Sequence, residues 1–257
     1  MNIKELYAYR EMIISLVRKD LRGRYKGSVL GFMWTFINPL LQLLVYTLVF
    51  SEIIKMGIDK FYLFIFIGLV PWIFFSSSIT GGATIVLQQQ DLIKKIYFPR
   101  LVLPVAYITS SFINMIFSFV VIFVVILCSK VGFNVNALLL LPIIMVCEYI
   151  LSLGIALIAS AITVYLRDLE HILNIISLAW MYLTPIVYPI EMVPDKYKLM
   201  FNINPMVPII TAYRDILFYK RIPNMTTISH AFILGILILI FGCLIFSKLQ
   251  KNFAEEL

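Results

Sequence analysis

The stretch Ile93–Pro104, IKKIYFPRLVLP, decides the fold because it places two lysines, an arginine and two prolines between two long apolar runs. Those runs, about residues 61–87 and 101–128, are each long enough to cross a bilayer as a helix, which takes about 20 residues. Basic residues collect in the segments that join spans on the cytoplasmic side of a membrane. The stretch therefore predicts two membrane spans joined by a short basic segment, residues 88–100.

The composition of the whole chain agrees with this interpretation. Of 257 residues, 61% are hydrophobic and only 14% are charged, and the mean hydropathy is +0.97, well outside the range of soluble domains. The residues outside the predicted spans are too few to form a separate soluble domain. We predict an all-α integral membrane protein with one transmembrane domain over residues 1–257 and six transmembrane helices, at about residues 31–54, 61–87, 101–128, 137–166, 171–188 and 227–246.

The distribution of lysine and arginine predicts the orientation. With the N-terminus inside, the cytoplasmic segments hold thirteen of these residues and the outer segments hold eight. The excess of basic residues follows the positive-inside rule. We therefore expect a multi-pass protein with both termini and segment 88–100 in the cytoplasm.

Two segments outside the spans have features of their own. Residues 1–27 alternate apolar and basic residues at helical spacing, which predicts an amphipathic helix at the cytoplasmic membrane interface; a simple lipid anchor is the alternative. In the outer segment, residues 189–226, Asn204-Pro205 is typical of a helix start, and the helix that follows is too short to span. We predict re-entrant helices there, before the last span.

The sequence contains no motif of an enzyme. It has no phosphate-binding loop of the form GxxxxGK, and no glycine in it is followed by lysine, so it has no P-loop of its own for ATP. Cysteine and histidine do not occur at metal-ligand spacing, and we expect no metal site. Glu148 is the one acid deep in a predicted span. It is either a hydrogen-bonded packing residue or a group facing a wet pathway.

Aromatic residues are the remaining signal in the spans. Trp and Tyr commonly form belts at membrane interfaces. Their flat faces with polar tips also suit sugar rings, which stack through C–H groups. Spacing alone does not choose between these uses for Trp34, Tyr46, Phe50, Trp180 and Tyr182.

A series of blocks resembles a known family across nearly the whole chain. In order, these are KDLRGRYKGSVLGFMW, NPLLQLLVYTLVF, PWIFFSSS, QQQDLIKKIYFPRLVLP, YLRDLEHIL, TPIVYPIEMVP and NPMVPIITAYRDIL. They resemble the membrane (permease) subunit of bacterial ATP-binding-cassette (ABC) exporters of lipid-linked polysaccharide, the group of the O-antigen and teichoic-acid exporters.

The resemblance implies a homodimer in the bacterial inner membrane that works with two copies of a separate ATPase subunit. ATP and Mg²⁺ would bind to that subunit, so this chain would need no cofactor, and the cargo would be an undecaprenyl-diphosphate-linked glycan. Segment 88–100 would dock into the ATPase as a rigid cytoplasmic knob, unless it is only a basic turn. Its expected docking residues, with an exposed Tyr97-Phe98 pair as the anchor, are Asp91, Lys94, Lys95, Tyr97, Phe98 and Arg100.

The resemblance also assigns substrate-facing residues. Arg22, Arg24 and Lys26 become candidates for the lipid diphosphate, since arginine offers forked donors to phosphate oxygens. The first and fifth spans would border the path at the dimer centre, which makes the aromatic residues named above candidates for its lining. The alternatives are an ABC exporter of a smaller amphiphile and a membrane-embedded glycan-processing enzyme. No nucleic-acid partner is expected.

Overall fold

The computed structural model describes residues 3–24 and 26–256, which form helices joined by short segments, with no strand among them. Five helical segments are long and apolar enough to cross a membrane. They are Gly31–Ile53, Phe61–Lys95, Val102–Cys128, Val135–Tyr165 and Met225–Asn252. The all-helical class and five of the six predicted spans are confirmed.

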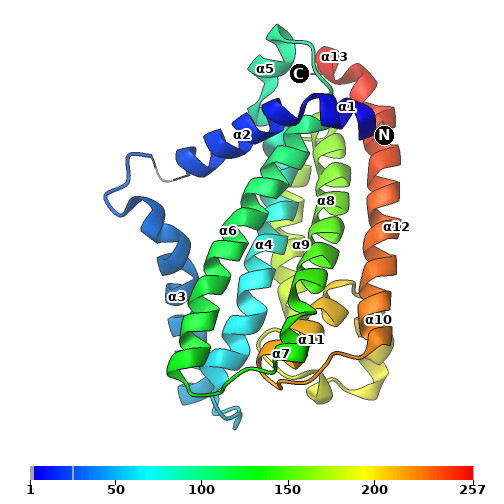
Figure 1. The fold of residues 1–257 in the computed structure, drawn as a ribbon. Helices are drawn as coiled ribbons and strands as arrows, with labels where there is room; N and C mark the ends of the chain where they lie inside the picture. The colour runs from blue at the N-terminus through cyan, green and yellow to red at the C-terminus, as the bar shows by residue number, and fades with distance from the viewer. Residues whose placement is uncertain (1–2, 25, 257) are drawn as a thin grey trace.

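The chain runs up and down through a bundle, with short helices at both ends (Figure 1). At one end lie α1 (Ile3–Ala8), α2 (Arg10–Gly23), α5 (Gln90–Lys95) and α13 (Phe253–Glu256); at the other lie α7 (Val135–Leu138), α10 (Lys198–Ile203) and α11 (Met206–Leu217). The long helices between them are α3 (Trp34–Thr47), α4 (Phe61–Gln88), α6 (Val102–Cys128), α8 (Leu141–Tyr165), α9 (Leu169–Tyr182) and α12 (Met225–Leu249). Short non-α turns are η1 (Gly31–Met33), the π-helical η2 (Leu48–Ile53), η3 (Ile190–Met192), η4 (Asp195–Tyr197) and η5 (Gln250–Asn252).

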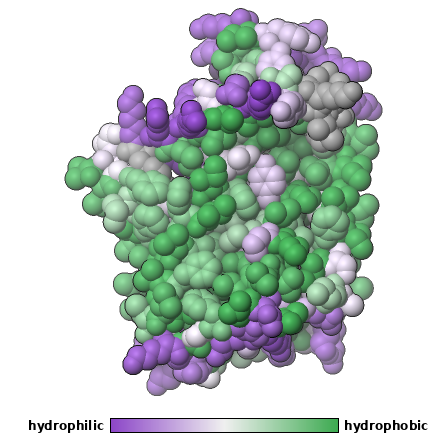
Figure 2. Space-filling view, in the orientation of Figure 1, coloured by the Kyte–Doolittle hydropathy of each residue, from purple (hydrophilic) through white to green (hydrophobic). Residues whose placement is uncertain are grey.

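Helix α4 forms the centre of the bundle. It packs against α3, α6, α8, α9 and α11, and most of its side chains are buried. A helix that is apolar on all sides lies either in a protein core or in a bilayer, and the neighbouring helices make α4 the core here. Helices α3 and α12 instead leave broad apolar faces exposed, which form part of the hydrophobic band between two polar ends in Figure 2.

Helices α8 and α12 cross in close contact because glycines face each other at the crossing. A Cβ atom added to Gly154 would lie 2.7 Å from the backbone nitrogen of Leu239, and one added to Gly242 would meet the backbone of Gly154. Small residues let two helix backbones approach in a membrane, where packing has to replace the hydrophobic effect between helices. This crossing holds the last span against the bundle.

The predicted span 171–188 forms a helix only as far as Tyr182. The two prolines of the sequence TPIVYP explain the difference, because Pro185 lacks an N–H group and disfavours helical geometry at the preceding Thr184. Residues 183–188 continue without regular helix. The prediction of a continuous apolar helix there is wrong beyond Tyr182.

The outer segment is helical, as its sequence predicts. The Oδ1 atom of Asn204 accepts a hydrogen bond from the backbone nitrogen of Met206 at 3.0 Å, so Asn204 satisfies a donor at the start of α11. The short helix α10 begins after η4, which starts at the predicted Asp195. Most side chains of α11 are buried. The segment is therefore a packed part of the bundle.

Candidate functional site

Segment 88–100 projects from the end of the bundle that also holds α1, α2 and α13 (Figure 1). Helix α5 ends at Lys95, and Ile96 is extended, with φ −134° and ψ 137°. Extended backbone turns successive side chains to opposite sides. Because the segment projects from the bundle, side chains on both sides stay exposed here: Tyr97 is 94% and Ile96 55% exposed, and Asp91, Lys94 and Lys95 are also on the surface.

Phe98 and Arg100 point toward the bundle, away from the exposed face of Tyr97. Phe98 is only 5% exposed and belongs to a buried cluster with Ile93, Phe246 and Phe253. Arg100 donates to the backbone carbonyl of Gln250, and its guanidinium lies 5.8 Å from the ring centroid of Phe253. The expectation of an exposed Tyr97-Phe98 pair is therefore wrong for Phe98, which turns inward and packs against the C-terminal end of the chain. Phe98 and Arg100 instead attach the segment to the C-terminal end of the chain.

A cleft of about 750 Å³ lies under this segment. Its wall is formed by residues 93–100 together with Tyr9, Gln250 and Lys251. The wall carries the basic residues Lys94, Lys95, Arg100 and Lys251 next to the aromatic ring of Tyr97. Such a surface suits a protein partner with acidic and apolar groups.

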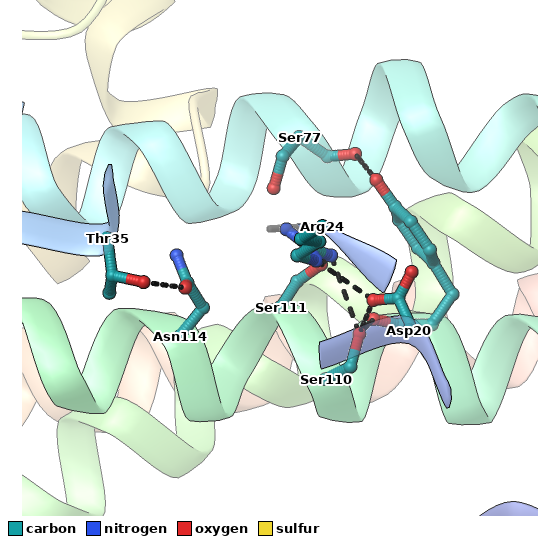
Figure 3. A network of polar contacts seen from close by, with 8 residues as sticks. Asp20, Arg24, Thr35, Ser77, Ser110, Ser111 and Asn114 are labelled. Atoms are coloured by element: carbon teal, nitrogen blue, oxygen red, sulfur yellow. Dashed lines mark hydrogen bonds and ion pairs between the residues drawn. The ribbon is translucent and has the colours of Figure 1, made fainter. Parts of the chain in front are cut away.

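A polar network connects α2 with α6 and α4 (Figure 3). Arg24, directly after α2, donates from Nε to Asp20 Oδ2 at 2.9 Å and from Nη2 to Ser111 Oγ at 2.8 Å. Ser110 donates to the same carboxylate. Close by, the hydroxyl of Tyr107 donates to the backbone carbonyl of Ser77 on α4 at 3.3 Å. The network thus joins the end of α2 to the interior of α6, two turns after α6 begins at Val102.

The network continues along α6 toward α3. Thr35 Oγ1 donates to Asn114 Oδ1 at 3.1 Å, and Ser118 Oγ donates to the backbone carbonyl of Thr35 at 3.3 Å. Pro39 explains the second bond, because it lacks the N–H that would otherwise pair with the carbonyl four residues earlier in α3. The freed carbonyl receives its hydrogen bond from a neighbouring helix, as the absence of water in a bilayer requires.

A cavity of about 400 Å³ lies beside these groups. Its wall comes from α3, α4 and α6 with Arg24 at the margin, and consists of Arg24, Trp34, Thr35, Asn38, Pro39, Val70, Ile73, Phe74, Ser77, Ser111, Asn114, Met115 and Ser118. A second cavity, of about 380 Å³, also borders Arg24 and lies between α2, α4 and the start of α6. Arg24 is thus the residue shared by the two cavities.

The three candidates for the lipid diphosphate do not form one cluster. Arg24 is held by Asp20 and the serines, and its side chain is 25% exposed. Arg22 and Lys26 are exposed. The predicted interface helix 1–27 is two helices, α1 and α2, and its residues 1, 2 and 25 lie outside the described residues.

The aromatic candidates lie on α3, η2 and α9. Trp34 Nε1 donates to Ser28 Oγ at 2.9 Å, and the ring centroid of Phe50 lies 6.3 Å from that of Tyr46. Trp180 Nε1 donates to Asn204 Oδ1 at 2.9 Å, which ties α9 to the start of α11, whereas Tyr182 is 51% exposed.

Helices α3 and α9 meet where the Tyr46 hydroxyl donates to the sulfur of Met181 at 3.5 Å. Around this contact α3, its continuation η2 and α9 leave apolar side chains uncovered, including Leu44, Leu48, Ile175 and Leu178.

Glu148 is fully buried in α8. Its Oε2 accepts a hydrogen bond from the Tyr213 hydroxyl of α11 at 2.7 Å. Among the described residues, its Oε1 and the hydroxyl of Ser152, one turn along α8, have no hydrogen-bond partner. Neither Glu148 nor Tyr213 lines any of the three cavities described above. The contact joins α8 to α11, which favours the packing interpretation of Glu148.

Arg214 was not recognised from the sequence. It is 4% exposed, and its guanidinium donates to the backbone carbonyls of Pro185 and Ile186, the latter at 2.5 Å. The guanidinium also lies 3.6 Å from the ring centroid of Phe64 on α4. A Cβ atom at Gly68 would lie 3.2 Å from the arginine, so this glycine makes room for it. No carboxylate of the described residues lies within 4 Å of Arg214.

The Asp20, Ser110, Ser111 and Asn114 side chains of the network were also missed. A signal was present, because Ser110, Asn114 and Ser118 recur every fourth residue in an otherwise apolar run and so lie on one face of α6.

Known proteins give an independent comparison. The family profile described as ABC-2 type transporter matches residues 11–218. An O-antigen export system permease protein RfbA of Myxococcus xanthus is 35% identical over 99% of this chain and 98% of the relative. A protein of the same name from Klebsiella pneumoniae is 32% identical over 96% of this chain and 95% of its own length. The polysialic acid transport protein KpsM of Escherichia coli is 21% identical over 92% of this chain and 93% of its own length.

Proposed function

Because the chain belongs to the ABC-2 type transporter family, we propose that it exports lipid-linked O-antigen, or a closely related cell-surface glycan, across the bacterial cytoplasmic membrane. The chain is the membrane subunit of an ABC transporter, and ATP hydrolysis belongs to a separate subunit. The observation that carries the choice of cargo is the end-to-end similarity, at 31% identity or more, to three permeases named for O-antigen export.

In this account segment 88–100 lies in the cytoplasm and docks on the ATPase. The exposed Ile96 and Tyr97 form the apolar part of the contact, and Asp91, Lys94 and Lys95 form its charged rim. Phe98 and Arg100 stay with the permease and transmit movement of the segment to α6 and to the end of α12. Because Phe98 and Arg100 both attach segment 88–100 to the permease, a movement of the bound ATPase shifts the segment and these attachment points together.

The orientation has a direct test in intact cells. Single cysteines introduced at Asp91 and Asp168 should stay unlabelled by a membrane-impermeant thiol reagent, whereas one at Lys196 should react. This expectation follows from the excess of basic residues in the segments assigned to the cytoplasm. Labelling of the cysteine at position 91 from outside would reverse the orientation and remove the docking assignment.

The working unit in this proposal is a homodimer with two ATPase copies. In this arrangement the second copy packs on the uncovered apolar side chains of α3 and α9, which a single copy leaves to the lipid. α9 together with residues 183–188 serves as the fifth of six spans. Trp34, Tyr46, Phe50, Trp180 and Tyr182 then lie on the two helices that border the dimer centre. A cysteine at Leu44 should cross-link two copies; purely monomeric permease would contradict the arrangement.

The cargo in this account is an undecaprenyl-diphosphate-linked glycan that approaches along the membrane interface near α2. Arg22 and Lys26 are exposed there, and Arg24 borders both neighbouring cavities. The basic side chains attract the diphosphate, while the polymer itself meets mainly neutral groups. A sliding polymer needs many weak, similar contacts, because a strong ionic site would hold it in place.

Deletion of the gene in its own bacterium tests the export function. Surface glycan should disappear, and lipid-linked glycan of full length should accumulate on the cytoplasmic side, because its synthesis does not depend on export. Re-expression of the chain with its ATPase should restore the surface glycan, and a hydrolysis-deficient ATPase should not. Normal surface glycan in the deletion strain would refute the proposed cargo and would favour a smaller amphiphile.

A further inference from the structure

We propose that the cavity between α3, α4 and α6 binds the uncharged sugar ring that is attached directly to the lipid diphosphate. The inference rests on the proposed function, because it takes a lipid-linked glycan as the cargo. It goes further by giving the permease a recognition site for the first sugar, inside a single subunit.

The chemistry of the wall fits a neutral polyhydroxyl ligand. Hydroxyl and amide side chains of Thr35, Asn38, Ser111, Asn114 and Ser118 supply both donors and acceptors of hydrogen bonds. Arg24 is the one charged residue in the wall, and its charge is paired with Asp20 at 2.9 Å. Apart from Arg24 the wall offers no charge to an ion, whereas its hydroxyl and amide groups can exchange hydrogen bonds with a ring that carries several hydroxyl groups.

Helix packing explains the direct bonds of Thr35, Asn114 and Ser118 between α3 and α6, but not the open space beside them. Polar side chains that only join membrane helices work at close contact, where small residues let the helices touch. Here they surround about 400 Å³ of space, which lies in the range of ligand pockets, about 300–1,000 Å³. Thr35 and Ser118 are nearly fully buried, and their hydroxyls are held in fixed positions by hydrogen bonds between α3 and α6.

The position of the cavity relative to Arg24 indicates where the diphosphate, the first sugar and the lipid tail of the ligand would lie. Ser111 accepts a hydrogen bond from Arg24, and Asn114 and Ser118 follow on the same helix, a rise of about 10 Å from Ser111 to Ser118. A diphosphate near Arg24 would place its first sugar beside Asn114. The lipid tail stays outside, in the bilayer next to the start of α3.

The cavity wall also contains flat apolar surface. Trp34 and Phe74 belong to the wall, and the indole nitrogen of Trp34 is held by Ser28 at 2.9 Å. An aromatic face next to hydrogen-bonding groups combines stacking with orientation, as sites for small ligands commonly do.

A binding experiment on the purified complex of permease and ATPase in nanodiscs tests the inference. The probes are undecaprenyl diphosphate and undecaprenyl diphosphate that carries one hexose. The wild-type complex should bind the hexose-bearing probe at least tenfold more tightly. The double variant Thr35→Val with Asn114→Leu should lose this preference, while its affinity for undecaprenyl diphosphate should stay within twofold of the wild type.

The double variant removes both partners of the Thr35–Asn114 hydrogen bond, and such paired replacement by apolar groups of similar shape is close to neutral for folding. Ser118→Ala provides a second variant in the same wall and should reduce the preference by about threefold; because it also removes the donor to the Thr35 carbonyl, its thermal unfolding is measured alongside. Thr109→Val is the matched control, since Thr109 lies on α6 but bonds to Tyr149 outside the cavity wall. It should keep the full preference.

Two results would overturn the inference, and they differ in meaning. Equal binding of both probes by the wild type, or a preference that survives in the double variant and in Ser118→Ala, would exclude the sugar site and leave the export function in place. If the wild-type complex binds neither probe, the proposed cargo fails and the sugar site fails with it.

Discussion

Replacing Arg214 by leucine is expected to remove most of the folded protein from the membrane. The guanidinium satisfies the carbonyls of Pro185 and Ile186 at the end of α9 and covers the ring of Phe64 on α4. Leucine would leave these buried carbonyls without donors, at a cost of about 1–3 kcal/mol for each group. The free energy of unfolding of a whole domain is about 5–15 kcal/mol. The amount of permease in membranes and its thermal unfolding in detergent measure the effect.

The same measurements on two further variants separate the geometry of the arginine from its charge. Arg214→Lys should recover only part of the stability, because an ammonium group cannot place forked donors on two carbonyls. Arg167→Leu, at an exposed arginine in the turn between α8 and α9, should unfold within a few degrees of the wild type. Unchanged unfolding of Arg214→Leu would show that the irregular segment 183–188 is held by other contacts.

Replacing Ile96 and Tyr97 together by alanine is expected to separate the permease from its ATPase. Both side chains are exposed on segment 88–100, so the change should leave the fold intact. Apolar and aromatic anchors at the centre of an interface contribute about 2 kcal/mol or more each, which corresponds to about 30-fold in affinity for each residue. Co-purification of the two subunits and the surface glycan of cells are the measurements.

The matched control is the double variant Tyr197→Ala with Ile203→Ala. These two side chains are the same residue types and are also exposed, but they belong to η4 and α10 at the opposite end of the bundle. This variant should keep the ATPase bound. If the Ile96 and Tyr97 variant keeps both the complex and full export, segment 88–100 is only a basic turn that follows the positive-inside rule.

Features of this fold that depend on neighbouring residues alone could be predicted from the sequence. Long apolar runs predict five spans because burial in a bilayer constrains about 20 consecutive residues at once. The start of α11 was predictable because a cap depends on neighbouring residues only, Asn204 and Pro205. The end of α9 was missed because the apolar composition of 183–188 hides its non-helical backbone. Two prolines break the helix there, and Arg214, distant in sequence, satisfies the freed carbonyls.

The candidate site was less predictable, since it depends on contacts between distant segments. The basic residues of 88–100 mark a cytoplasmic segment, but only the fold shows that Phe98 packs against the C-terminal end while Tyr97 faces outward. Arg24 was named from the sequence as a phosphate ligand. Its partners Asp20, Ser110 and Ser111 come together only when α2 packs across α6. Charge is visible in a sequence, whereas the groups that balance it are not.

ATP-dependent movement of lipid-linked glycan in proteoliposomes tests the central claim most directly. The vesicles contain the permease with its ATPase facing outward and the glycan lipid in the outer leaflet, and the measured quantity is the fraction of glycan protected from an added glycosidase. With external ATP and Mg²⁺ this fraction should rise with time, and it should stay constant with a non-hydrolysable ATP analogue. A glycan fraction that stays unprotected while the complex hydrolyses ATP and moves a short amphiphile would contradict the account.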